Sequence, residues 1–350
     1  MSAPSPRILW VDCFRGLCIV LVVFGHVAGG LAAGGLVQDG SSLSGVRAWV
    51  YLFHMPAFFF ASGLFAAKLV QAPTLAFLRS RAATVVYPYC VWTGIVLASQ
   101  CALARFANNP PDVARALRFP VEPYGYGLWF LYALLLISVV YQAAGRLKLP
   151  ALGIAAAGLL MYLAASRDWF RFWTILNTSF TYFVYFSLGA CFAPVALTCF
   201  EGKSWHGPMG LAAAAFAAMT LLHQFRAGPT PWIGLMLAAL GIAGVLGLAK
   251  ALVRLHLDRF WSYTGAHSLE VYLGHILLAT LPRPLLKAAG ISQPWVYVIC
   301  GVGFGVLGSL VLMALCQRWR FPYLYRWPLD RNWATKPEAP TVAAASRQHT

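Results

Sequence analysis

The sixteen residues from Val11 to His26 read V-D-C-F-R-G-L-C-I-V-L-V-V-F-G-H. Apart from Asp12, Arg15 and His26, every residue in this stretch is apolar or glycine. A charged side chain inside a membrane span costs about 2.5–3.5 kcal/mol on insertion scales, so ionisable residues in such a run are functional candidates. The stretch predicts a membrane-spanning helix over about residues 14–34. Its ionisable side chains do not favour membrane insertion, so we treat them as candidates for a functional site.

Similar apolar runs recur along the whole chain. Of its 350 residues 60% are hydrophobic and only 10% are charged, whereas soluble domains have roughly 25% charged residues. This excludes a soluble Rossmann enzyme and a disulfide-rich secreted domain, and it predicts an all-α fold, a polytopic membrane bundle of about ten transmembrane helices. The expected spans are about 14–34, 48–67, 83–104, 126–144, 149–165, 174–195, 208–224, 232–253, 268–288 and 295–317.

These spans define one transmembrane domain over residues 1–325. The remaining residues, 326–350, are polar and contain Pro328, Pro337 and Pro340, so we expect a disordered cytoplasmic tail. A cleaved signal peptide is the competing interpretation of the first run, but Asp12 and Arg15 fit it poorly. The eight cysteines form no C-x-x-C pair, so we expect them to act as small hydrophobic residues, neither disulfides nor metal ligands. No permanently bound cofactor and no metal are expected.

The net charge of +16 suits membrane headgroups and topology better than nucleic acid, because the basic residues gather at the ends of the apolar runs. Outside the ten spans or near their ends, sixteen Lys and Arg lie on the side of the termini and nine on the other side. Without the tail the balance is only ten to nine. The positive-inside rule therefore predicts a protein of the inner (plasma) membrane with both termini in the cytoplasm.

Arg15 and His26 share one face of the first predicted helix. The step of eleven residues returns to within about 20° of the same direction and covers ~16 Å along the axis. Arg15 would lie near the cytoplasmic boundary and His26 deeper, which suits an elongated ligand with an anionic end and a reactive end. Asp12 lies one turn before Arg15 and could orient its guanidinium group. The alternative is an interfacial Asp–Arg pair with a hydrogen-bonded core histidine.

Two further groups of polar residues follow the first helix. His54 stands in the second span directly before a Met-Pro step, where open backbone groups could meet a ligand; an aromatic belt with an incidental histidine is the alternative. Arg79 and Arg81 precede the third span and could bind phosphate, since guanidinium groups pair with phosphate oxygens. Ordinary topology-determining arginines would explain them as well.

The ninth predicted span contains a polar stripe. Ser268, Tyr272 and His275 stand at i, i+4 and i+7, so they lie on one side of a helix. They can orient groups in a site, or they can simply hydrogen-bond to neighbouring helices.

In their order along the chain, these segments resemble the acyltransferase 3 family of integral membrane proteins, in particular the fucose 4-O-acetylase-like and other sugar O-acetyltransferases. The resemblance covers residues 8–317. The segments are D-C-F-R-G from residue 12, F-H-M-P-A-F-F-F-A-S-G from 53, R-S-R-A-A-T-V-V-Y-P-Y from 79, L-W-F-L from 128 and S-L-E-V-Y-L-G-H from 268.

This resemblance implies about ten spans and an O-acyltransferase that takes an acyl group, most simply acetyl, from cytoplasmic acyl-CoA to a hydroxyl of a glycan or related acceptor, as in polysaccharide modification. Acyl-CoA is then a co-substrate, and the family's R-x10-H pattern matches Arg15, for donor binding, and His26, for catalysis, with His54 as the competing base. The family's basic motif is R-x-x-R, whereas this chain has R-x-R at Arg79 and Arg81. That departure weakens the transfer of the CoA-binding role to these two arginines.

Histidine suits this chemistry independently, because a hydroxyl that attacks a thioester needs a base of near-neutral pKa. A secondary transporter of a small polar solute or glycan intermediate is the alternative, in which the ionisable residues would relay protons. We expect no pair of corresponding broken helices in the two halves, which argues against it. A non-catalytic membrane partner in polysaccharide export would leave Arg15, His26 and His54 unexplained.

The charge distribution predicts the orientation directly. Reporter fusions at Met1 and Thr350 should both show cytoplasmic activity, because most basic residues outside the spans lie on that side. Periplasmic activity at both ends would invert the topology and place Arg79 on the wrong side for cytoplasmic CoA.

Overall fold

The computed structural model describes residues 7–102, 127–170, 172–202, 204–225 and 230–327. These residues form helices and turns, with no strand among them, so the predicted all-α class is confirmed. The predicted tail from residue 328 onward, and the end of the third predicted span, lie outside the described residues.

Six helical segments in the described part are long and apolar enough to cross a membrane. They are α1 (Leu9–Ala33), the run α5 to α6 (Thr74–Ala102), α8 (Trp129–Arg146), α12 (His206–Phe225), α13 (Pro231–Arg254) and the run α17 to α18 (Pro294–Arg318). The other helices are α2 (Ser42–Tyr51), α3 (His54–Gly63), α4 (Ala66–Gln71), α9 (Ala151–Ala165), α10 (Thr174–Cys191), α11 (Ala193–Thr198), α14 (Arg259–Ala266), α15 (Ser268–Leu278) and α16 (Pro282–Ala288). Ten spans remain a prediction.

The outer surface of the bundle is apolar. Large side chains such as Leu152, Phe225 and Ile299 are 73%, 81% and 70% exposed, which a water-soluble surface rarely tolerates in such number. In helices the backbone polar groups bond within the segment, so these surfaces can face lipid. The bundle is therefore built as a multi-pass membrane protein.

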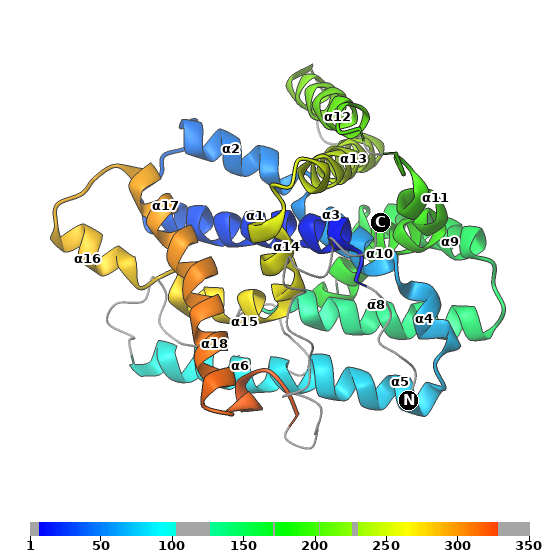
Figure 1. Cartoon of the computed structure of the whole chain (residues 1–350), viewed down its shortest axis with the longest axis horizontal. Coiled ribbons are helices and arrows are strands. Elements are labelled where there is room, and N and C mark those ends of the chain that lie inside the picture. The colour runs from blue at the N-terminus through cyan, green and yellow to red at the C-terminus, as the bar shows by residue number, and fades with distance from the viewer. Residues whose placement is uncertain (1–6, 103–126, 171, 203, 226–229, 328–350) are drawn as a thin grey trace, which may run out of the picture.

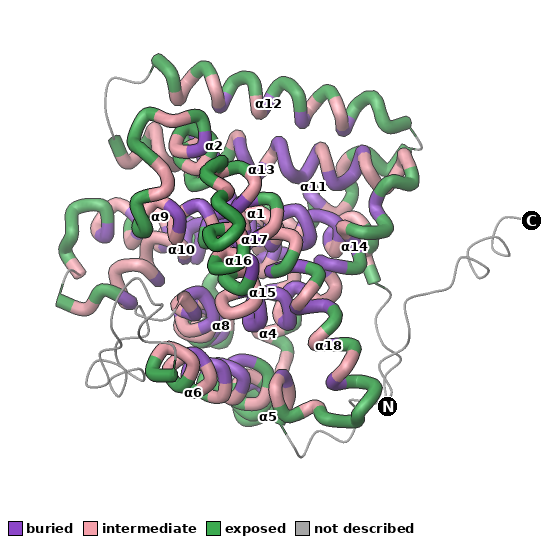
Figure 2. Tube along the Cα trace, turned by 90° about the vertical axis from the view of Figure 1, so that its left-hand side faces the viewer, coloured by how far each residue is buried: buried purple, intermediate pink, exposed green. Residues whose placement is uncertain are grey.

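Helix α1 occupies the centre of the bundle (Figure 1), and α12 and the α5–α6 run lie at opposite edges in both views (Figure 2). Helix α14 packs very closely against this central helix. A Cβ atom at Gly16 would collide with the backbone of Trp261, and one at Gly265 with the backbone of Asp12. Small residues allow such an approach in membranes, so α1 and α14 touch backbone to backbone, and α15 starts directly beside α1.

Two of the ten predicted spans are broken. The span predicted at 48–67 divides into α2, α3 and α4, with Leu52–Phe53 and Leu64–Phe65 between them. The span predicted at 268–288 divides into α15 and α16, where Pro282 and Pro284 interrupt the helix. Two predicted spans are thus interrupted in the structure, and the expectation that the two halves contain no pair of corresponding broken helices stays a prediction.

Two other runs are continuous but contain a wider turn. A π-helical turn, η1 (Ala82–Val86), joins α5 (Thr74–Arg81) to α6 (Tyr87–Ala102). A second, η4 (Phe304–Gly308), joins α17 (Pro294–Gly303) to α18 (Ser309–Arg318). Such turns occur often at functional sites, and η1 contributes to one of the two pockets described below.

The α1–α14 contact predicts the effect of one added methyl group. Replacing Gly265 by Ala should destabilise the folded protein by about 1–3 kcal/mol, as overpacking does, because the methyl group meets backbone that cannot rotate away. Gly94→Ala in α6 is the matched control, since a Cβ at Gly94 meets no atom within 4 Å. Thermal unfolding of the detergent-solubilised variants measures both. Equal melting temperatures would show that α1 and α14 are not in close contact.

Candidate functional site

Two pockets lie along α15. The first, here the arginine pocket, has a cavity volume of about 200 Å³. It is lined by Arg15 of α1, Arg81 of α5, the η1 turn, and Ser268 and Tyr272 of α15. Segments more than 250 residues apart in the sequence thus bring two guanidinium groups to one cavity.

Arg15 is held by its neighbours. Its Nη2 donates a hydrogen bond to Ser268 Oγ at 2.9 Å, and its charge interacts with the carboxylates of Asp12 and Glu270. The predicted polar stripe therefore begins at the guanidinium group of the first helix. Glu270, which lies off that stripe in sequence, is a neighbour that the helical periodicity did not indicate.

The two arginines of the R-S-R segment occupy different environments. Arg81 lines the arginine pocket and packs its guanidinium carbon 5.5 Å from the centre of the Phe77 ring. Arg79 is exposed and is not among the lining residues. The structure thus brings Arg81, but not Arg79, together with Arg15.

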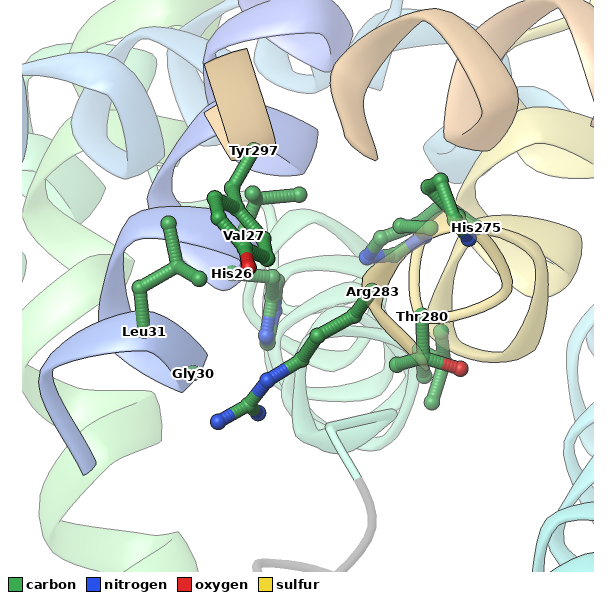
Figure 3. A pocket seen from close by; sticks show the side chains of 11 residues that line it. His26, Val27, Gly30, Leu31, His275, Thr280, Arg283 and Tyr297 are labelled. Carbon is green, nitrogen blue, oxygen red and sulfur yellow. The ribbon is translucent and has the colours of Figure 1, made fainter. Parts of the chain in front are cut away.

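The second pocket, here the histidine pocket, has a cavity volume of about 130 Å³ and is lined by His26, His275, Thr280, Arg283 and Tyr297, with apolar neighbours (Figure 3). The rings of His26 and His275 are 5.0 Å apart, centre to centre. His26 is exposed to this cavity, whereas His275 is completely buried. Of the two histidines, His26 is the one that a ligand in the pocket can reach.

Hydrogen bonds to the backbone fix the tautomers of His275 and His54. His275 Nδ1 lies 3.1 Å from the carbonyl oxygen of Val271, and His54 Nδ1 lies 2.9 Å from that of Val50. Because a carbonyl oxygen only accepts, Nδ1 must carry the proton in each ring. Nε2 of each neutral ring is then an acceptor.

His54 lies close to His26 without lining the histidine pocket. His26 is near enough for a charge on one ring to repel a charge on the other, and the His54 ring packs 4.8 Å from that of Tyr51. His54 is 5% exposed, so a ligand in the histidine pocket has no direct access to it.

Tyr272 stands between the two pockets. Its hydroxyl donates to the carbonyl oxygen of Gly127 at 2.8 Å, and its ring lies 5.7 Å from that of His275. Gly127 has φ of +72°, a conformation that favours glycine, and a Cβ there would lie 3.5 Å from His26 Cε1. The stripe Ser268, Tyr272 and His275 therefore follows α15 from the arginine pocket to the histidine pocket.

Three residues of the histidine pocket were not predicted from the sequence. Arg283, Thr280 and Tyr297 line it, and none of the three is among the candidates that the sequence suggests. The position of Arg283 between Pro282 and Pro284, directly after the break in the ninth predicted span, was the available signal. Within the described residues no cluster of His, Cys, Asp and Glu has the composition of a metal site.

Comparison with known proteins gives the class of the chain. A family model described as an acyltransferase domain, that of the acyltransferase 3 family, matches residues 8–314. The chain therefore belongs to this family of membrane acyltransferases.

The chain is also similar to an inner membrane protein of a bacterium. Over 211 residues the chain is 28% identical to the inner membrane protein YcfT of Escherichia coli (strain K12), a match that covers 55% of this chain and 58% of that protein. The chain thus spans less than two thirds of that relative. No solved structure matches the chain.

Proposed function

We propose that the chain transfers an acyl group, most simply acetyl, from acyl-CoA on the cytoplasmic side to a hydroxyl of a glycan or a related small acceptor. The donor's phosphates bind at the arginine pocket, and the acceptor hydroxyl enters the histidine pocket. His26 removes the proton from that hydroxyl. No tightly bound cofactor is needed, since acyl-CoA is consumed as a co-substrate.

One observation carries this proposal: the same helix, α15, lines a cavity that holds two guanidinium groups and a second cavity that holds an accessible histidine. Guanidinium groups pair with phosphate oxygens through parallel hydrogen bonds. The eleven residues from Arg15 to His26 correspond to ~16 Å of helix. An extended pantetheine arm has the length to bring a thioester from one cavity to the other.

The reaction then follows from the residue types. The acceptor oxygen attacks the thioester carbon while a nitrogen of His26 takes the hydroxyl proton. A C–O bond forms, the C–S bond breaks, and the proton passes from His26 to the leaving CoA sulfur.

The two broken segments support a second candidate function. The division of the predicted spans 48–67 and 268–288 is a feature that transporters use to hold substrate at unwound backbone. The purified protein in lipid nanodiscs distinguishes the two: an acyltransferase releases free CoA when acyl-CoA and an acceptor are supplied. A transporter moves solute across proteoliposomes and leaves acyl-CoA intact.

The R-S-R segment provides a matched pair of variants. Arg81→Gln should weaken acyl-CoA binding about 10- to 100-fold, the effect of losing one charge-assisted hydrogen bond. Arg79→Gln should weaken it much less, because Arg79 is exposed and does not line the pocket. Isothermal titration with acyl-CoA measures both. A larger effect at Arg79 would place the donor outside the arginine pocket.

The role of His26 predicts a specific loss of turnover. His26→Gln should lower the rate of acyl transfer about 10²- to 10⁴-fold, the usual contribution of a positioned base, while acyl-CoA still binds. His206→Gln is the control, since His206 is exposed, stacks on Trp205 and lines neither pocket. Product formation followed by mass spectrometry, with affinity measured separately, is the assay. A folded His26→Gln protein of near-parental rate would move the assignment to His54.

A further inference from the structure

We propose that His275 is the positioning residue for His26: its Nε2 accepts a hydrogen bond from one nitrogen of the His26 ring, so the other nitrogen of His26 faces the acceptor hydroxyl with its lone pair. The catalytic part of this inference rests on the proposed function. The pairing of the two rings can be tested without any assay of acyl transfer.

The backbone hydrogen bond of His275 determines its tautomer. Its Nδ1 donates to the carbonyl oxygen of Val271, so Nε2 is left as an acceptor. His275 is completely buried, and within the part of the chain that the structure describes its Nε2 has no hydrogen-bond partner. Buried polar atoms in native proteins are nearly always satisfied. An orphaned acceptor on the wall of a pocket therefore points to a donor that arrives there.

His26 is the donor nearest to hand for Nε2 of His275. His26 lies across the pocket wall from His275 (Figure 3), with 5.0 Å between ring centres and 56° between ring planes. Two imidazole rings joined by an N–H···N bond have a similar spacing between their centres, so the two rings are close enough for this bond. The neighbouring Tyr272 cannot serve, because its hydroxyl donates to Gly127.

A hydrogen bond to His275 would orient the basic nitrogen of His26. With one N–H of His26 directed to His275, the other nitrogen is the base, and its orientation no longer depends on chance rotation of the ring. After proton transfer both nitrogens of His26 carry protons: one is held by His275 and the other is delivered to the departing thiolate. His275 itself neither gains nor loses a proton, and it touches neither substrate, so its part is positioning.

His54 is the competing partner, since its Nε2 is also an acceptor and its ring is close to His26. The described contacts favour His275. The His54 ring packs against Tyr51, and His54 does not line the cavity that His26 enters. Replacing each residue separately distinguishes them.

The structural test uses the full-length protein, labelled with ¹⁵N-histidine, in lipid nanodiscs. Nitrogen–proton correlation spectra report the tautomer of each ring, and His→Gln variants assign the signals. We expect His275 to carry its proton on Nδ1 and His26 to adopt one tautomer, which becomes a mixture in His275→Leu but not in His54→Leu. A mixture at His26 already in the parent protein would overturn the pairing. So would an unchanged His26 signal in His275→Leu.

The kinetic test separates positioning from binding. His275→Leu should lower kcat about 10- to 100-fold, by analogy with the loss seen when the group that orients a metal-bound histidine is removed, with KM for donor and acceptor unchanged. His275→Gln, which keeps an acceptor oxygen, should recover part of the rate. The exposed His206→Leu is the control. A raised KM for the acceptor at unchanged kcat would mean that His275 binds substrate, which contradicts the proposal.

The two tests fail separately. If the protein consumes no acyl-CoA under any condition, the proposed function is wrong, and the nitrogen spectra still decide whether His275 fixes the tautomer of His26. If acyl transfer is observed but the His26 signals ignore His275, the function stands and the positioning role is wrong.

Discussion

The site depends on one contact, the backbone-to-backbone approach of α1 and α14 at Gly16 and Gly265. Because α15 begins two residues after α14 ends, this contact determines where Ser268 lies relative to Arg15. The remaining polar residues of α15 follow at helical intervals and reach the level of His26. Lipid does not drive helices together by the hydrophobic effect, so close packing of small residues is what sets such distances in a membrane.

A second constraint is the scarcity of water within the bundle, which requires internal partners for polar groups. Arg15 bonds Ser268, Tyr272 bonds a carbonyl, and both His54 and His275 donate to carbonyls one turn earlier in their own chain. His26 differs, since it opens onto a cavity. A polar side chain that stays accessible in such surroundings is free to interact with a ligand in the cavity.

Much of this arrangement could be predicted from the sequence. Helical periodicity alone put Arg15 and His26 on one face, and it put Ser268, Tyr272 and His275 on another. Periodicity cannot say which two faces meet, because the Arg15–Ser268 bond joins residues 253 positions apart. It also could not show that the second predicted span breaks at Phe53, or that Arg283 turns into a pocket after the proline-interrupted helix. Both features depend on how neighbouring helices hydrogen-bond to the backbone groups that a helix break leaves open. Those neighbours are distant in the sequence, so a local pattern does not reveal them.

The π-helical turn η1 has a consequence for helix phase. It directly follows Arg81 and places an extra residue in the run from α5 to α6. One residue corresponds to about 100° of rotation about the axis, so the face that α5 presents is turned by that angle relative to the face of α6. The arginine that faces the cavity is therefore selected jointly by the spacing of the basic residues and by the winding of the turn after them. A chain with the same arginines and a regular helix there would present a different side of the segment to the cavity.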